Sequence, residues 1–168
     1  PRGAGKAGKG LPRTGLAAHG SGKAGAGDGL GGGFSGEGKG GAVTLVDRKS
    51  GLICGWVVHS RQARETRNAI VEALKDKPIK SLSLDNGSEF AEFRELEEQL
   101  KAPVYFAEPH KPWQRGCNEN ANGLLRYFFP RGCNFLDITQ AEFERVLDLI
   151  NHRPRKRLNW RTPFDVFF

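Results

Sequence analysis

Glycine is distributed very unevenly along the chain, and this limits which part can form a folded core. Seventeen of the 23 glycines lie in residues 1–41, mixed with alanine, lysine and arginine. Such a segment has too little apolar side-chain area to offset the entropy lost when it becomes ordered. We therefore expect residues 1–41 to be a basic, mostly flexible arm that contains at most a degraded first strand, and residues 42–168 to be the folded domain.

The positive charges of the arm fit two interpretations equally well. One is a tail that follows the phosphates of a nucleic acid, and the other is a solvated linker or a stretch of degraded coding sequence. The glycines do not form a phosphate-binding loop, because no GxxxxGK[ST] pattern occurs in the chain.

From residue 42 onward, regular hydrophobic patterns predict an α/β fold. Short β-rich runs lie at 42–47, 52–58, 79–85 and 103–109, and turn residues between the first two predict a hairpin. Helical spacing of apolar residues occurs at 61–77, 88–101, 117–129 and 139–152. The order of these elements predicts a mixed sheet covered by helices.

The helix expected at 139–152 has the strongest signal. Thr139 and Glu142 are spaced as a capping box, and Ile138 and Phe143 are placed for a hydrophobic staple. We expect this helix to begin at the threonine.

Charge and cysteine content limit the partners and the compartment. The net charge of +7 favours a polyanionic partner, most simply nucleic acid. No apolar run reaches the length of a membrane span, and no signal peptide is evident. The cysteines Cys54, Cys117 and Cys133 lack CxxC spacing, so we expect small buried side chains in a reducing cytoplasm rather than zinc ligands or disulfides. We also expect the chain to be a fragment of a longer protein.

Two carboxylates stand out as candidate metal ligands. Asp85 directly follows a predicted strand, where α/β folds bind ligands, although Asp-Asn-Gly is also an ordinary turn sequence. Glu119 is the only carboxylate between residues 109 and 133, and Arg126 follows it by two helical turns on the same face. One acid among cations suits a metal–phosphate site, but a solvent-facing Glu–Arg pair is the plain alternative.

Two Mg²⁺ ions would need about three carboxylates, so a third must come from upstream. Asp28 is the only aspartate before residue 47. Asp47 is its rival, but Asp47 stands at the head of a tight turn where it would only close the hairpin.

Four stretches resemble the catalytic core of bacterial insertion-sequence transposases of the IS-thirty family. They are VTLVDRKS, LDNGSEF, YFAEPHKPWQRGCNENANGLLRYFFPRG and NHRPRKRLNWRTPFDVF, and they span about residues 42–168. The 33 residues between Asp85 and Glu119 also match the family's spacing. The resemblance implies an integrase-type DDE recombinase with a ribonuclease-H-like fold.

That family implies cleavage and joining of DNA strands in transposition. By resemblance, Asp28, Asp85 and Glu119 would hold two Mg²⁺ ions, with Mn²⁺ as an alternative metal, and Arg126 would be the catalytic basic residue. DNA contacts would come from residues around the site and from the basic segment that follows residue 151: Asn86, Lys111, Trp113, Gln114, Arg115, Asn118, Asn120, Arg153, Arg155, Lys156 and Arg157. For that basic segment, a solvated stretch after a helix is the alternative.

The expected partners are DNA, as element ends and target, and further copies of the same transposase, in the bacterial cytoplasm and at the nucleoid. No membrane partner is expected. Binding through phosphate contacts would weaken steeply with salt.

The front of the chain departs from the family's pattern. A hydrophobic first strand carries the first acid in the family, whereas the region around Asp28 reads AGAGDGLGGG. Glycines weaken a central strand. An inactive remnant that only binds DNA is therefore the alternative function. A related nuclease that does not join strands fits the long PWQRG…NGLLR match less well.

Overall fold

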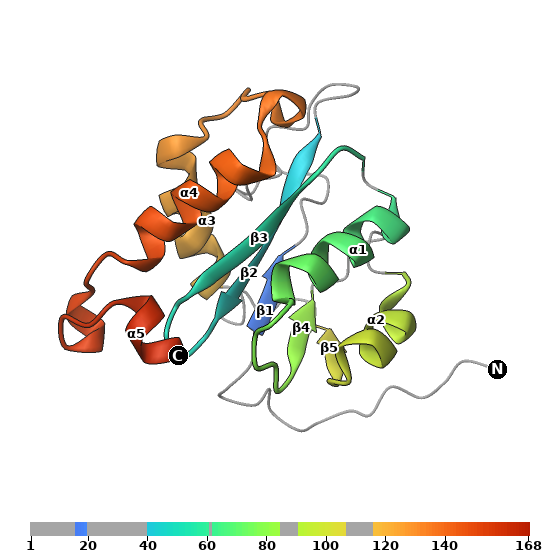
Figure 1. Ribbon diagram of the computed structural model, residues 1–168, viewed down its shortest axis with the longest axis horizontal. Coiled ribbons are helices and arrows are strands. Elements are labelled where there is room, and N and C mark those ends of the chain that lie inside the picture. The colour runs from blue at the N-terminus through green and yellow to red at the C-terminus, as the bar shows by residue number, and fades with distance from the viewer. Residues whose placement is uncertain (1–15, 20–39, 61, 85–90, 107–115) are drawn as a thin grey trace.

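The strands pair into a five-stranded mixed sheet in the order β3-β2-β1-β4-β5 (Figure 1). The computed structural model describes residues 16–19, 40–60, 62–84, 91–106 and 116–168. The strands are β1 (Leu16–His19), β2 (Gly41–Asp47), β3 (Ile53–Val58), β4 (Leu82–Leu84) and β5 (Val104–Phe106). The helices are α1 (Ala63–Leu74), α2 (Phe93–Leu100), α3 (Gly116–Phe128), α4 (Gln140–Asn151) and α5 (Pro163–Phe167), with 3₁₀ turns at Phe135–Asp137 and Lys156–Leu158.

The central strand β1 comes from the glycine-rich segment. It pairs antiparallel with β2, where Leu16 faces Asp47 and His19 faces Thr44. It pairs parallel with β4, where Leu16 faces Leu82. The carboxyl ends of β1 and β4 therefore meet at the same edge of the sheet. The division of the chain at residue 41 stays a prediction, but one strand of the sheet lies before it.

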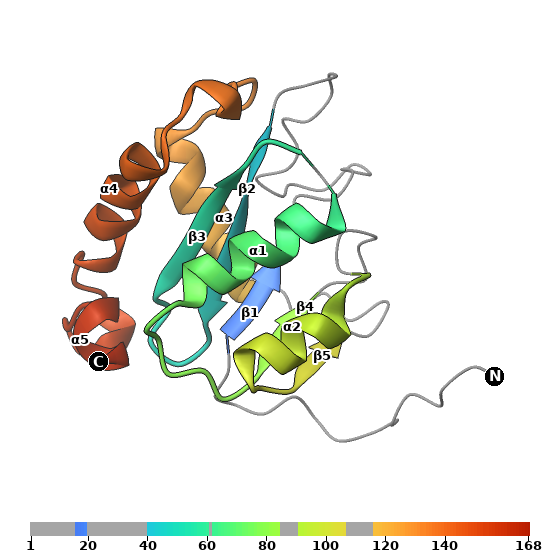
Figure 2. The same cartoon turned by 45° about the vertical axis from the view of Figure 1, so that its right-hand side comes forward.

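Helices cover both faces of the sheet, and each face has its own apolar core (Figure 2). Alternation along β2 sends Val43 and Leu45 toward α1 and α2, and it sends Ala42 and Val46 toward α3 and α4. On the first face, Arg67 of α1 forms ion pairs with Glu92 and Glu95, which join α1 to α2.

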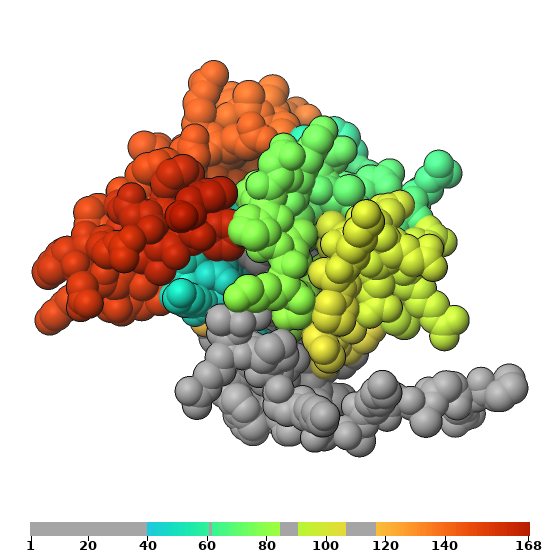
Figure 3. Space-filling model, turned by 60° about the horizontal axis from the view of Figure 1, so that its bottom comes forward, coloured from blue at the N-terminus to red at the C-terminus, as the bar shows by residue number. Residues whose placement is uncertain are grey.

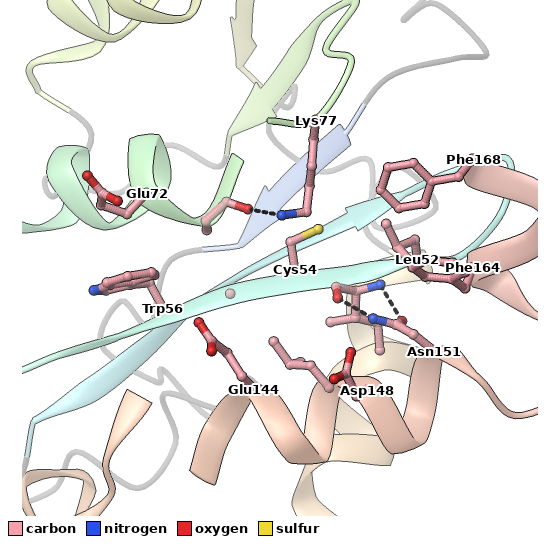
Figure 4. A pocket seen from close by; sticks show the side chains of 14 residues that line it. Leu52, Cys54, Trp56, Glu72, Lys77, Glu144, Asp148, Asn151, Phe164 and Phe168 are labelled. Carbon is pink, nitrogen blue, oxygen red and sulfur yellow. Dashed lines mark hydrogen bonds between the residues drawn. The ribbon is translucent and has the colours of Figure 1, made fainter. Parts of the chain in front are cut away.

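The edge strand β3 is covered by side chains of α4. Asn151 accepts a hydrogen bond from the backbone N–H of Ile53 and donates one to its carbonyl oxygen, both at 2.8 Å (Figure 4). Gln140 accepts a bond from the N–H of Val57 at 2.9 Å and donates to the carbonyl of Gly55 at 3.4 Å. Two amide side chains thus occupy backbone groups that an added strand would use.

Most of the predicted elements are present with shifted ends. The hairpin is confirmed, and so is the capping box at Thr139 and Glu142. The helix predicted at 61–77 ends at Leu74, because Lys75 leaves helical geometry and Asp76 adopts φ +62°. The strand predicted at 79–85 is confined to Leu82–Leu84, where its side chains are buried. The short helix α5, which begins with its own capping box at Thr162, was not predicted.

Candidate functional site

Glu119 lies in the first turn of α3 and is exposed. Its neighbours on the helix are buried against the sheet: Asn118 is 3% exposed and Asn122 is 1% exposed. Thr44 of β2 donates its hydroxyl to the side-chain oxygen of Asn122 at 3.1 Å. Because Thr44 faces His19, this bond fixes α3 beside the carboxyl end of β1.

Asn118 and Asn120 differ in burial. The side chain of Asn118 is buried, and its amide oxygen has no hydrogen-bond partner. Asn120 is exposed on the same helix. The predicted DNA contacts of both residues stay predictions.

The strand β4 ends at Leu84, one residue before Asp85. Asp85 itself is outside the described residues, as are six further residues of the predicted site: Asp28, Asn86, Lys111, Trp113, Gln114 and Arg115. Their predicted roles stay predictions.

The central strand does not carry the predicted first acid. β1 reads LAAH, and Asp28 comes nine residues after its end at His19. Asp28 lies outside the described residues, so its predicted roles as the first acid and as a metal ligand stay predictions.

Asp47, the rival first acid, is used by the hairpin turn. Its carboxylate accepts hydrogen bonds from the N–H of Ser50 at 2.7 Å and from the hydroxyl of Ser50 at 2.6 Å. The side chain is 8% exposed. This confirms that Asp47 closes the hairpin, as the turn sequence predicted.

Within the described ranges, no three His, Cys, Asp or Glu side chains gather as a metal site. Among the described residues of the predicted site, Glu119 is suited to bind a metal, because its exposed carboxylate supplies the oxygen ligand that Mg²⁺ prefers. Arg126 is half-buried two turns later on α3 and has an interaction partner of its own.

The basic segment after α4 folds back onto the hairpin turn (Figure 3). Arg157 donates hydrogen bonds to the carbonyl oxygens of Lys49 at 3.2 Å and Ser50 at 2.8 Å. Arg157 therefore anchors the segment. Arg153, Lys156 and Arg157 are all exposed, but Arg157 donates to the hairpin carbonyls, so Arg153 and Lys156 are better placed to meet phosphates.

A groove of about 690 Å³ lies between α3 and this segment. Asn120 and Tyr127 line its α3 side, and Arg153, Arg155 and Lys156 line the opposite side. The sequence did not single out Tyr127. An aromatic residue on the polar part of a helix, near a cluster of arginines, was the available signal.

A second cavity, of about 320 Å³, lies over β3 between α1, α4 and the chain's end (Figure 4). Glu72, Lys77, Glu144 and Asp148 line it together with apolar side chains. Lys77 donates to the carbonyl of Ala73 at 2.9 Å. We assign no chemistry to this cavity.

The cysteines differ from one another. Burial raises the pKa of the Cys54 thiol to about 11 and makes it an inert core side chain, as expected. Cys133 is half-buried. The same expectation is wrong for Cys117, which is exposed because the first turn of α3 directs it away from the sheet.

No helix in the described part of the chain is both long and apolar enough to cross a membrane.

Comparison with known proteins agrees with this arrangement. The model of the family "Integrase core domain" matches residues 26–112, a range that includes Asp28 and Asp85 and ends before Glu119. The matched range begins after the end of β1 at His19.

Two similar curated proteins are transposases. The transposase for insertion sequence element IS4351 of Bacteroides fragilis is 35% identical over 133 residues, which cover 77% of this chain and 40% of that protein. Transposase InsI for element IS30C of Escherichia coli K12 is 37% identical over 127 residues, or 74% of this chain and 33% of that protein. The chain thus spans two fifths or less of the length of these relatives.

Among solved structures, the catalytic core domain of BIV integrase has the same fold. It superposes with a TM-score of 0.62 at 21% identity and covers 77% of this chain and 86% of that one. This likeness confirms the ribonuclease-H-like mixed sheet flanked by helices. The family match over about half of the chain shows that the chain belongs to the integrase core domain family.

Proposed function

We propose that this chain is the catalytic core of a DNA transposase, which cleaves phosphodiester bonds at element ends and joins them to target DNA. The observation that carries the proposal is the hydrogen bond from Thr44 to Asn122. It holds α3, which carries Glu119, beside the carboxyl end of β1. β1 pairs in parallel with β4, and β4 ends one residue before Asp85. Carboxylates at that edge are where α/β folds bind their ligands.

In this proposal Asp85 and Glu119 hold divalent metal, and Asp28 supplies a third carboxylate. Family members generally use such ions, and we propose two Mg²⁺ here, with Mn²⁺ able to replace them. When bound, the ions activate the attacking oxygen and stabilise the leaving oxygen of the phosphodiester.

The remaining residues position the DNA. Arg126 orients a phosphate near Glu119, and Asn120 contacts the strand. The proposed site is completed by five further residues, Asn86, Lys111, Trp113, Gln114 and Arg115. As the relatives are longer proteins, DNA-end recognition is assigned to parts that this chain does not cover, and we expect several copies to act together on paired ends, in the bacterial cytoplasm and at the nucleoid.

The test is Mg²⁺-dependent cleavage of end-labelled DNA by the complete transposase that contains this core. Asp85→Asn and Glu119→Gln should each abolish cleavage and leave metal-free DNA binding unchanged. Glu98→Gln is the matched control, because Glu98 is exposed on α2, on the opposite face of the sheet. Normal cleavage by either site variant refutes the metal-site assignment.

Asp28→Asn tests the third ligand separately. Loss of cleavage with this variant supports Asp28 as the first acid, whereas unchanged cleavage removes Asp28 from the site.

A further inference from the structure

The groove between α3 and the basic segment has an unusual charge distribution. Four cations line it, Arg153, Arg155, Lys156 and Arg157, and its lining contains no carboxylate. Like charges gathered this closely repel one another unless an anion lies between them.

Arg155 shows this imbalance most clearly. Burial, followed by repulsion from Arg157 and Arg153, lowers the pKa of its guanidinium. One of its terminal nitrogens, Nη2, is buried and has no hydrogen-bond partner. Arg157 lies beside it, but the guanidinium of Arg157 donates hydrogen bonds to the backbone carbonyls of the hairpin turn. A buried donor without a partner is costly, and an anionic oxygen is the group that would satisfy it.

The opposite wall offers an exposed aromatic ring. Tyr127 is 86% exposed, and its ring meets Phe128 edge-on at a centroid distance of 5.4 Å. Leu149 of α4, 64% exposed, continues the apolar surface along the groove. An exposed ring that faces a row of cations is the combination found in single-strand nucleic-acid sites, where bases stack and phosphates pair with arginine or lysine.

We propose that this groove binds an unpaired segment of DNA strand, with its phosphates on Arg153, Arg155 and Lys156 and a base stacked on Tyr127. A base can present its face to the ring only when it is not stacked within a duplex. The volume of about 690 Å³ lies in the range of pockets that hold small ligands, so it accommodates a short stretch of strand rather than a duplex.

The groove also lies next to the candidate metal site. Asn120, which lines one end, follows Glu119 directly in α3, and Tyr127 is seven residues further along the helix. Seven residues correspond to about 10 Å of helix. A strand freed at the metal site would therefore enter the groove along α3. This inference rests on the proposed function for its choice of DNA as ligand.

A second copy of the chain fits the groove less well. A two-fold contact through the same face would bring the two sets of cations together, and the chain already carries a net charge of +7.

The test measures binding of fluorescein-labelled oligothymidine, about 15 nucleotides long, and of a duplex of equal length, to this chain without divalent metal. We expect Tyr127→Ala to weaken single-strand binding about tenfold and to change duplex binding by less than twofold, because stacking requires an unpaired base. Tyr127→Phe keeps the ring and should bind as the unchanged chain does. Since Tyr127 is 86% exposed, neither variant should change the thermal unfolding midpoint.

Arg155→Gln tests the phosphate side. It should weaken single-strand binding about tenfold. It should also make the slope of log affinity against log salt concentration less steep, by the amount that corresponds to about one phosphate contact. Arg145→Gln is the charge-matched control, because Arg145 is exposed on α4 outside the groove. Equal effects of the two arginine variants would refute a specific phosphate site.

Unchanged single-strand affinity of Tyr127→Ala would overturn the proposal. So would a shift of that variant from dimer to monomer in sedimentation with DNA binding intact, because the groove would then be a contact between copies. Because oligothymidine binding is measured without divalent metal, a failure of the catalytic proposal leaves it intact and is distinguishable from a failure of this one.

Discussion

Asn151→Leu tests how α4 closes the edge of the sheet. The substitution keeps a branched side chain of similar shape but removes both hydrogen bonds to Ile53. Ile53 is 1% exposed and Asn151 is 6% exposed, so water cannot replace the lost partners easily. Each buried backbone group left without a partner costs about 1–3 kcal/mol, which gives about 4 kcal/mol for the pair.

A loss of that size is a large fraction of the 5–15 kcal/mol that stabilises a typical domain. With a slope of about 2 kcal/mol per molar urea, the unfolding midpoint should fall by about 2 M. The measurement is equilibrium urea unfolding followed by circular dichroism. Asn68→Leu is the control, since Asn68 is exposed on α1 and its substitution should change the free energy of unfolding by less than about 0.5 kcal/mol.

A urea midpoint within about 0.5 M of that of the unchanged chain would refute the reasoning. It would mean that the backbone groups of Ile53 find other partners. The double variant Asn151→Leu with Gln140→Leu frees the outer backbone groups of β3. We expect it to self-associate through that edge, with a rise in light scattering in proportion to concentration.

Three further predictions test other parts of the structure. Gly55→Ala should destabilise the fold by about 2 kcal/mol in urea unfolding, because an added Cβ would lie 2.6 Å from a carbonyl oxygen of β2; an unchanged midpoint would contradict this packing. The hydrogen bonds from the backbone and side chain of Thr139 lower the pKa of Glu142. This cap therefore stabilises α4 fully when the pH is above the usual glutamate pKa of 4.5, and the stabilisation is lost as the pH falls through the lowered pKa. Between pH 6 and pH 3, the thermal unfolding midpoint of Thr139→Ala should therefore fall less than that of the unchanged chain. An equal fall in both proteins would contradict this role of the cap. At pH 8, Cys117 should react with a thiol reagent at once, whereas Cys54 should react only on unfolding; simultaneous reaction would contradict the difference in burial.

Local sequence determined the elements whose signals lie within a few residues. The capping box at Thr139 and Glu142 placed the start of α4 correctly, since both partners are on one helical turn. The turn after β2 likewise gave Asp47 its structural role, because its partner Ser50 is three residues away. The long motif around Glu119 indicated the family before any geometry was known, and the comparisons confirm it.

Contacts between distant residues were beyond the reach of the sequence. The strand LAAH is too short to stand out, and it is a strand because β2 and β4 offer backbone groups on both of its sides. The burial of Asn118 was not evident from its motif, because it depends on how α3 packs on β2, where Thr44 bonds to Asn122, 78 positions later. Arg157 and Tyr127 show the same limit. One arginine anchors a turn more than 100 residues away, and the tyrosine ring faces a groove whose other wall comes after α4. Periodicity reports which face of an element is apolar, but only packing decides what that face, and the polar one opposite, will meet.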